Sequence, residues 1–298
     1  MTSEADTLAA LTARIRAELP ALQFTNAVLN DYGEDNQVVV ADDAWIVRFP
    51  RPDNLGRFGA ELNLLDEFSK VSLVRVPDYE HVTRDRTFGA YRMIGGVELT
   101  PPRFAALRPD VQSNVLADLA GFLSALHALP MQTLAQADGH IERCWSGEQF
   151  AALYRGMRRA KIARKVDEAW LARFDAFHAA FERVTQGVPR LAHGDLSDDH
   201  ILVAEDGYLS GVIDFTDAAW GDPAIDFAYF WRLGEPVVDH VLTLYTLTPQ
   251  DPGLKTRAHW TFVRYLINQL WYGERAKWNL TVNEALAELD GHLRALGL

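Results

Sequence analysis

Two clusters of carboxylates in the second half of the chain have the residue types and spacing to do chemistry. The first reads LAHGDLSDDHILV over residues 191–203, and the second reads GVIDF over 211–215 and GDPAIDF over 221–227. Each is an apolar strand that ends in a carboxylate, so several negative groups would gather at one edge of a sheet. They would repel one another unless a cation joined them. Magnesium on a polyphosphate is the usual cation of this kind, and the pattern therefore indicates phosphoryl transfer.

These segments resemble those of a known family. His193-Gly194-Asp195, His200 and the strand-borne Asp214 are similar to the catalytic and metal segments of the aminoglycoside phosphotransferase family, which shares the protein-kinase fold. His200 stands where most relatives carry Asn, which resembles the branch that phosphorylates the 2″ hydroxyl. The resemblance covers nearly all 298 residues and is specific in these two segments. It implies an α+β, bilobal, protein-kinase-like fold with a β-rich N-terminal lobe over residues 1–94 and a mainly helical C-terminal lobe over residues 95–298.

The resemblance also implies roles for individual residues. Asp195 matches the base that takes the proton of the acceptor hydroxyl, and Asp214 matches a magnesium ligand. His200 takes the second ligand position, where imidazole implies a weaker or water-mediated contact, or tolerance of manganese, because magnesium prefers oxygen. His193 is expected to brace the loop by hydrogen bonds. The carboxylates of residues 198 and 199 are expected to be solvated or to cap the loop.

Three further acids follow the strand that carries Asp214. Asp222 before Pro223 is an ordinary start for a helix over residues 224–233. Asp226 lies in the first turn of that helix, and by resemblance it braces the catalytic loop. Asp217 could face the acceptor substrate, and it could equally face water.

The first lobe is expected to hold the nucleotide. WIVRFP over residues 45–50 is an apolar strand with one cation, Arg48, where the family has a phosphate-binding Lys or Arg. Arg48 would neutralise the α and β phosphates and pair with Glu61, whereas an outward position on the strand is the alternative. Arg keeps the charge of Lys but binds with a different, forked geometry. The acidic segment 30–36 contains only Gly33 where kinases carry a glycine-rich loop, so its role stays open.

Residues 91–101 resemble the family's hinge between the lobes. The backbone of Arg92 and Ile94 would present carbonyl and amide groups to the purine edge, although a plain strand end followed by a Gly turn is the alternative. Backbone recognition leaves little trace in side chains, so the sequence does not distinguish ATP from GTP.

The acceptor site is the part of the protein that the sequence predicts least clearly. Aminoglycosides are polycations, which are bound by carboxylates and by aromatic faces. The resemblance to the 2″ branch points to four acceptor contacts, Glu235, Trp271, Tyr272 and Glu274, and Asp217 is a further candidate from its position after Asp214. Packing is the alternative role for the two aromatic residues.

Composition limits the other functions. The net charge of −12 argues against a nucleic-acid partner. No stretch approaches the roughly 20 apolar residues of a membrane span, and the N-terminus lacks a basic and then apolar signal region. Cys144 is the only cysteine, so an intramolecular disulfide is excluded and a reducing cytoplasm suits the chain. A cytoplasmic monomer that binds neither nucleic acid nor membrane is expected.

Hydrophobic periodicity predicts the elements that position these residues. A capping box at residues 3–6 opens a helix that Pro20 stops. The further predicted elements are strands over 22–29, 37–41 and 44–49, a helix over 55–68, a strand pair within 73–94, a helix over 110–129, and a helix that begins near residue 255.

The sequence thus predicts a magnesium-dependent phosphotransferase that moves the γ-phosphoryl of ATP or GTP to a hydroxyl of a small molecule, with a cationic aminoglycoside as the first expectation. A kinase of the same fold for a macrolide, choline or homoserine is the alternative within enzymes. A non-catalytic nucleotide-binding relative is a second alternative, supported by Arg48, His200 and the Gly-poor segment. A metal-dependent hydrolase built on His193, Asp195 and His200 is weaker, since no other His-rich segment completes a two-metal cluster.

Overall fold

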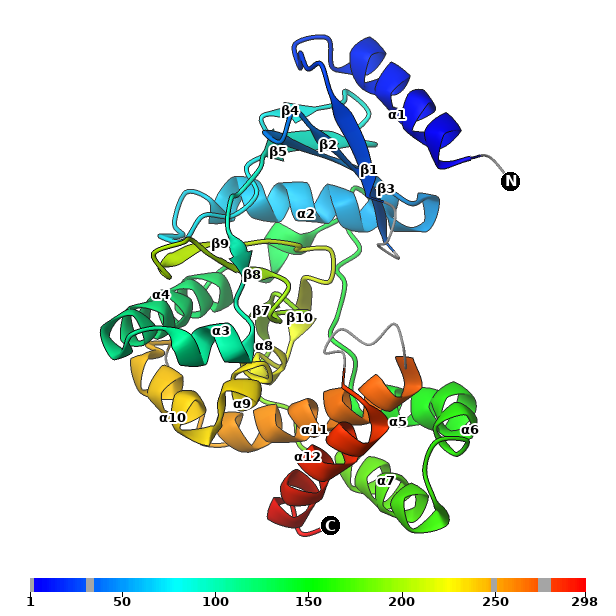
Figure 1. Ribbon diagram of the computed structural model, residues 1–298, viewed down its shortest axis with the longest axis vertical. Coiled ribbons are helices and arrows are strands. Elements are labelled where there is room, and N and C mark those ends of the chain that lie inside the picture. Colours follow the sequence, from blue (N-terminus) through cyan, green and yellow to red (C-terminus); the bar gives the residue numbers. More distant parts are fainter. Residues whose placement is uncertain (1–2, 31–34, 248–250, 273–279) are drawn as a thin grey trace.

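The chain folds into two lobes that are stacked one above the other (Figure 1). A computed structural model describes residues 3–30, 35–247, 251–272 and 280–298. An antiparallel sheet flanked by two helices forms the upper lobe, and helices with two small sheets form the lower lobe. The predicted α+β, protein-kinase-like architecture is confirmed. In the described part of the chain, no helix has the length and apolar character needed to cross a membrane.

The upper lobe is built on a five-stranded sheet. Its strand order is β1 (Ala27–Asn30), β2 (Asn36–Ala41), β3 (Trp45–Pro50), β5 (Gly89–Arg92) and β4 (His81–Val82). The helix α1 (Glu4–Glu18) begins at the predicted capping box of Ser3 and Asp6, and its Leu11 and Ile15 are buried. These two side chains and the inward faces of β2 and β3 form the apolar core of the lobe.

Two of the predicted strands are shorter than expected. The segment over 22–29 forms a strand only from Ala27, because the backbone N–H groups of Thr25 and Asn26 donate to the Asp42 carboxylate instead of a neighbouring strand. The strand pair within 73–94 is confined to β4 and β5. Val74 and Val76, which precede β4, are buried in the core of the lower lobe.

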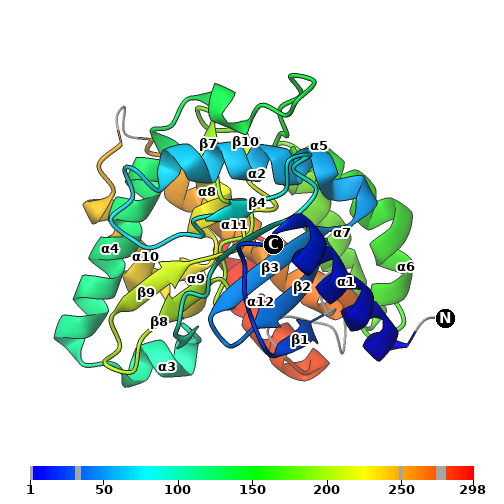
Figure 2. The same ribbon diagram turned by 90° about the horizontal axis from the view of Figure 1, so that it is seen from above.

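The helix α2 (Leu55–Phe68) follows the 3-10 turn η1 (Pro52–Asn54) and connects the two lobes by its packing. It has the predicted limits and lies between the upper sheet and the lower lobe (Figure 1), and seen from above it runs beside the strands of the sheet (Figure 2). Phe68 at its end contacts Phe122 and Phe215 edge-on, at ring-centroid distances of 5.2 and 6.1 Å. Side chains of α2, which belongs to the predicted N-terminal lobe of residues 1–94, therefore pack against residues of the C-terminal lobe.

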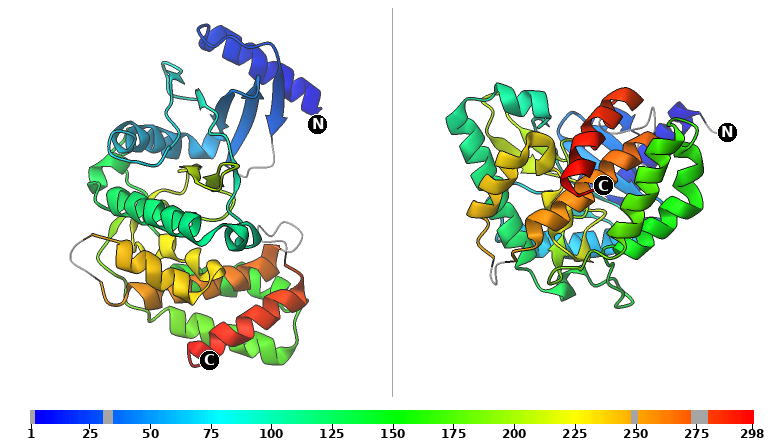
Figure 3. Two further views of the ribbon diagram at one scale, coloured as in Figure 1. Left: turned by 60° about the vertical axis from the view of Figure 1, so that its left-hand side comes forward. Right: turned by 90° about the horizontal axis from the view of Figure 1, so that it is seen from below.

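The lower lobe is mainly helical. The helix α4 (Pro109–His127) presents the predicted apolar stripe to the core, and α11 (Leu254–Tyr272) crosses the lobe beneath the small sheets (Figure 3). The other helical elements are α3 (Pro101–Ala106), η2 (Met131–Leu134), α5 (Gly147–Leu153), η3 (Tyr154–Arg158), α6 (Arg159–Ile162), α7 (Glu168–Phe181), α8 (Ala224–Phe227), α9 (Phe230–Leu233), α10 (Glu235–Leu244) and α12 (Val282–Ala295).

Two small sheets at the top of this lobe carry the carboxylate clusters. One sheet contains β6 (Val97–Glu98), β8 (Ile201–Val203) and β9 (Leu209–Val212), and the other pairs β7 (Arg190–Ala192) with β10 (Ala219–Gly221). The helix predicted over 224–233 is wrong as a continuous element. It is split into α8 and α9, since the bonds from Ala228 N–H to Ile225 O and from Trp231 N–H to Ala228 O each span only three residues.

Candidate active site

Asp226 holds the loop that carries Asp195. Its carboxylate is fully buried; Oδ2 accepts the N–H of His193 at 2.7 Å, and Oδ1 accepts the N–H of Gly194 at 2.9 Å. The Nε2–H of His127 donates to the same Oδ2 at 3.0 Å. The predicted bracing role of Asp226 is confirmed by these bonds, which fix the backbone immediately before Asp195.

His193 and Gly194 give the loop its shape. The buried His193 ring donates from Nε2 to the carbonyl of Ile213 at 3.1 Å, and burial lowers its pKa, so the ring stays neutral. Gly194 has φ of +85°, and a Cβ there would lie 2.1 Å from the backbone oxygen of Asp217. Only glycine fits this turn. The predicted bracing role of His193 is also confirmed.

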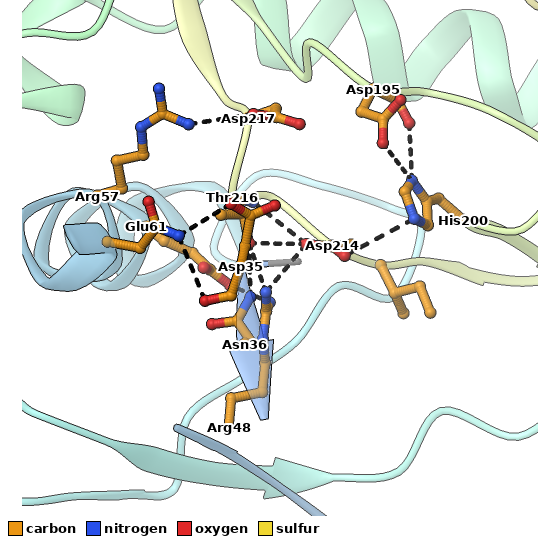
Figure 4. Close-up of polar contacts among 12 residues, drawn as sticks. Asp35, Asn36, Arg48, Arg57, Glu61, Asp195, His200, Asp214, Thr216 and Asp217 are labelled. Carbon is orange, nitrogen blue, oxygen red and sulfur yellow. Dashed lines mark hydrogen bonds and ion pairs between the residues drawn. The ribbon is translucent and has the colours of Figure 1, made fainter. Parts of the chain in front are cut away.

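His200 lies between the two carboxylates on which the chemistry depends (Figure 4). Its Nδ1 is 2.7 Å from the carbonyl oxygen of Asp195, which can only accept, so Nδ1 carries the proton. Nε2 faces two acids: it is 3.7 Å from Asp214 Oδ2 and 3.6 Å from Asp199 Oδ2. The predicted base and the predicted metal ligands thus belong to one cluster.

Asp214 occupies a strained position at the end of the strand that precedes it. Its φ of +64° is rare for a residue with a side chain, and such strain is typical of functional sites. Oδ1 accepts from Arg48 at 3.0 Å and from the Thr216 hydroxyl at 2.8 Å. Burial opposes ionisation, but Arg48 and His200 outweigh it and hold the pKa of Asp214 well below its usual range. Asp214 is therefore negatively charged at neutral pH.

Arg48 reaches Asp214 from the upper lobe. The residue is 3% exposed, which contradicts the alternative of an outward strand position. Its Nη1 donates to Glu61 Oε1 at 2.7 Å, and its Nη2 donates to Asp214 and to the Thr216 hydroxyl. Burial raises the pKa of Glu61 to about 7 against the opposing effect of Arg48. One guanidinium therefore links strand β3, helix α2 and the lower lobe (Figure 4).

The donors suit a metal that arrives with a nucleotide. Within the ranges that the structure describes, no three His, Cys, Asp or Glu side chains form a group that could hold a metal ion by themselves. Asp214 and His200 offer one oxygen and one nitrogen on the same side of the cleft. Protein-bound magnesium in phosphotransferases commonly takes one or two carboxylates and completes its shell with phosphate and water. The pair therefore fits a phosphate-bound magnesium, and its nitrogen donor also fits manganese.

The cluster opens into a cleft of about 1280 Å³ between the lobes. Seven of the predicted site residues line it: Arg48, Ile94, Asp195, His200, Asp214, Asp217 and Tyr272. Glu61 lies behind Arg48 and is buried. The guanidinium of Arg92 lies 3.7 Å from the ring centre of Trp45 and donates to Glu80. The expected role of Arg92 belongs to its backbone and stays a prediction.

The predicted acceptor residues are less well gathered. Asp217 accepts from Arg57 of α2 at 3.3 Å, and burial, with the neighbouring charges of Asp195 and Asp35, raises its pKa to about 6. Glu235 opens α10 and lies 2.8 Å from Lys255, and it is not among the residues that line the cleft. Trp271 lies at the end of α11. Glu274 falls outside the described residues.

The expectation that Asp198 is solvated or caps the loop is wrong. Its carboxylate is buried 3.6 Å from Arg232, and burial raises its pKa. Asp199 instead lines the cleft and accepts a bond from Ser197. Sequence reasoning also missed Thr216 and Arg57. Thr216 could have been suspected, since it follows Asp214 by two residues in the turn between β9 and β10. The sequence around Arg57 gives no signal of its contact with Asp217.

Two lobes with a cleft that joins a buried cation, paired metal donors and a braced aspartate define a phosphotransferase of the protein-kinase-like fold. Residues 26–260 match the phosphotransferase enzyme family, to which the chain therefore belongs. The enzyme class expected from the sequence, a phosphotransferase with an alcohol group as acceptor, is confirmed.

The chain is also similar to individual proteins. The uncharacterized protein YcbJ of Bacillus subtilis (strain 168) is 27% identical over 236 residues, which are 74% of each chain. The complex of APH(2″)-IIIa with GDP and kanamycin superimposes with a TM-score of 0.78 at 23% identity, over 97% of this chain and 99% of that one. The apoenzyme of the macrolide 2′-phosphotransferase MphH from Brachybacterium faecium gives a TM-score of 0.62 at 23% identity, over 97% of both chains. These similarities show the fold.

Proposed function

We propose that the enzyme transfers the γ-phosphoryl group of magnesium-bound ATP or GTP to a hydroxyl of a small molecule. The observation that carries this proposal is the partly buried contact of 3.0 Å between Arg48 and Asp214. It joins the cation suited to nucleotide phosphates to the carboxylate suited to their metal, beside the loop of Asp195. Opposite charges from two different lobes therefore meet at the cleft, as expected if Arg48 and Asp214 bind the same ligand.

The residues have separate tasks in the reaction. The acceptor oxygen forms a bond to the γ-phosphorus while the bond from that phosphorus to the β–γ bridging oxygen breaks. The Asp195 carboxylate takes the hydroxyl proton, and the nucleoside diphosphate leaves with its charge facing Arg48. Asp214 and His200 would hold magnesium, which neutralises phosphate charge when bound. Asp226 and His193 keep the backbone of Asp195 in place by the bonds described above.

The names of similar structures support the choice of donor and of reference acceptors. They include complexes with GDP, with ADP and with ATP and streptomycin. Kanamycin, gentamicin and streptomycin therefore belong in the first acceptor panel, with a macrolide as the alternative. Cytoplasmic location and a monomeric state stay predictions.

Nucleotide binding and turnover test the proposal together. The melting temperature is measured with ATP or GTP, with and without magnesium, and nucleotide consumption is then followed across the acceptor panel. We expect magnesium-dependent stabilisation by at least one nucleotide, and its loss in Asp214→Ala. Asp206→Ala, which removes an exposed acid from the β8–β9 hairpin, is the matched control and should behave like the wild type. Absence of any stabilisation by a magnesium-bound nucleotide would contradict the proposal.

A further inference from the structure

Two arginines line the cleft beside the residues of α11, Arg158 from η3 and Arg264 from α11 itself. Arg264 is 4% exposed, and Arg158 is half-buried. The Nε atoms of both are buried without a hydrogen-bond partner. Among the described residues, no carboxylate forms an ion pair with either guanidinium. Burial lowers the pKa of both, and for Arg264 the charge of Asp195 only partly opposes this effect. Arginine remains charged even so, and a buried cation without an anion is costly.

Aromatic rings support these cations but do not neutralise them. Arg264 lies 3.8 Å from the ring centre of Phe150 and 4.2 Å from that of Tyr265. Arg158 lies 4.8 Å from the ring centre of Trp271, and Lys161 lies 5.1 Å from the same ring. The aromatic face that was expected to receive a cationic acceptor is therefore already in contact with two cations of the chain itself.

The acids expected to bind a cationic acceptor are occupied in the same way. Glu235 pairs with Lys255 at 2.8 Å, and Asp217 pairs with Arg57 at 3.3 Å. A polycation would have to compete with Lys255 and Arg57 for these two carboxylates. The ion pairs that it would form in exchange are partly exposed, and each such pair contributes little.

The cationic character of this side of the cleft departs from the chain as a whole. The net charge is −12, yet residues 154–165 contain six cations and no acid. Arg155 pairs with Glu182 and Arg159 pairs with Asp175, whereas Arg158 and Lys161 lie over the ring of Trp271. Of these six cations Arg158 lines the cleft, and with Arg264 it places two positive charges on that side of the cleft.

We infer that the acceptor is a hydroxy compound that carries an anionic group, a carboxylate or a phosphate, which Arg158 and Arg264 bind while its hydroxyl faces Asp195. This inference rests on the proposed phosphotransferase function and specifies its substrate class. The forked guanidinium group matches the two oxygens of a carboxylate or phosphate. Tyr265 and Tyr272, which also line the cleft, offer aromatic faces to the carbon skeleton.

Sugars that share a skeleton and differ in charge test the inference. Glucuronate, glucose 6-phosphate, glucose and glucosamine, with kanamycin as a cationic reference, are titrated into enzyme saturated with magnesium and a non-hydrolysable ATP or GTP analogue. We expect at least one of the two anionic sugars to bind about tenfold or more tightly than glucose and glucosamine. The two anions separate a carboxylate site from a phosphate site. Tighter binding of glucosamine or kanamycin would overturn the inference, and so would failure of both anions to bind with a Kd of about 10 mM or lower.

Variants assign the effect to the two arginines. Arg158→Gln and Arg264→Gln should each weaken anion binding by about tenfold to a hundredfold and leave glucose binding unchanged. Arg158→Glu should reverse the preference, so that glucosamine binds more tightly than glucuronate. Arg164→Gln removes an exposed cation of the same segment and is the matched control. Because Arg264 is buried and its variant could unfold, the reversal by the half-buried Arg158→Glu decides the outcome.

The same measurements separate this inference from the proposed function. If the magnesium-bound nucleotide does not stabilise the wild type, the proposed function fails. If it does stabilise the wild type but the arginine variants lose nucleotide affinity instead of anion affinity, the guanidinium groups serve the donor, and the inference about the acceptor is overturned alone.

Discussion

Replacing Asp226 tests whether buried hydrogen bonds hold the catalytic loop. Its carboxylate accepts from three buried donors: the N–H groups of His193 and Gly194 and the Nε2–H of His127. A buried donor left without a partner costs about 1–3 kcal/mol. Asp226→Ala would therefore cost about 3–9 kcal/mol, which approaches the whole stability of about 5–15 kcal/mol of an ordinary protein. The isosteric Asp226→Asn is the better experiment.

Asn keeps one accepting oxygen and places an NH₂ group where the other stood. At least one of the three donors then faces another donor, so we expect Asp226→Asn to lower the free energy of unfolding by about 2–4 kcal/mol. The loop that carries Asp195 begins at the released amides, and a shift of about 1 Å there would lower kcat by up to about a hundredfold. Binding of the magnesium-bound nucleotide should change little, because Arg48 and Asp214 do not contact Asp226.

Urea denaturation followed by circular dichroism measures the stability, and steady-state nucleotide consumption measures kcat. Tyr245→Phe is the control: it removes the hydroxyl that lies 2.9 Å from His127 Nδ1, at the far end of the same chain of bonds. It should cost only about 0.5–1.5 kcal/mol and leave kcat unchanged. If Asp226→Asn has wild-type stability and turnover, the loop is held by other contacts and the reasoning is refuted.

Three further predictions concern the ion pair between the lobes, the thiol and the second metal position. Arg57→Gln should lower the free energy of unfolding by less than about 2 kcal/mol, because its ion pairs with Asp217 and Glu142 are partly exposed; a larger loss in urea denaturation would show that they are stronger. Burial raises the pKa of the Cys144 thiol to about 12, so at pH 8 the thiol should stay protonated. It should therefore react with a disulfide reagent much more slowly in the native protein than in urea, and equal reaction rates would contradict the burial. His200→Asn should keep turnover and favour magnesium over manganese, as read from activity with each metal, since it exchanges a nitrogen donor for oxygen; loss of all metal dependence would show another role.

Local patterns predicted the fold well where one rule governed the segment. The helix over 55–68 has the limits that its apolar spacing indicates, and the capping box at Ser3 starts the first helix. The predicted strand over 22–29 was too long because a tertiary contact replaces strand pairing: the Asp42 carboxylate accepts the backbone N–H groups of Thr25 and Asn26. Such a contact between distant residues leaves no periodic pattern of apolar residues in the sequence.

The same distinction explains what could be foreseen of the site. Asp195, His200 and Asp214 are close in sequence and were brought together by adjacent strands, so motif spacing sufficed to group them. The acceptor side depends instead on segments that are far apart in sequence, such as Arg158 and Arg264. Their packing, and not their type, half-buries Arg158, buries Arg264 and leaves the Nε atoms of both without a hydrogen-bond partner. Long-range pairing of charges was therefore the part that the sequence did not reveal.

The central claim, that Asp195 is the base for transfer from a bound magnesium nucleotide, is tested most directly by Asp195→Asn. Turnover is measured as release of nucleoside diphosphate with the best acceptor, and affinity for the magnesium-bound nucleotide is measured on the same preparation by calorimetry. We predict that kcat falls about a hundredfold or more, as for the loss of a general base, while the nucleotide Kd changes less than about threefold. Near-normal turnover in Asp195→Asn would contradict the account.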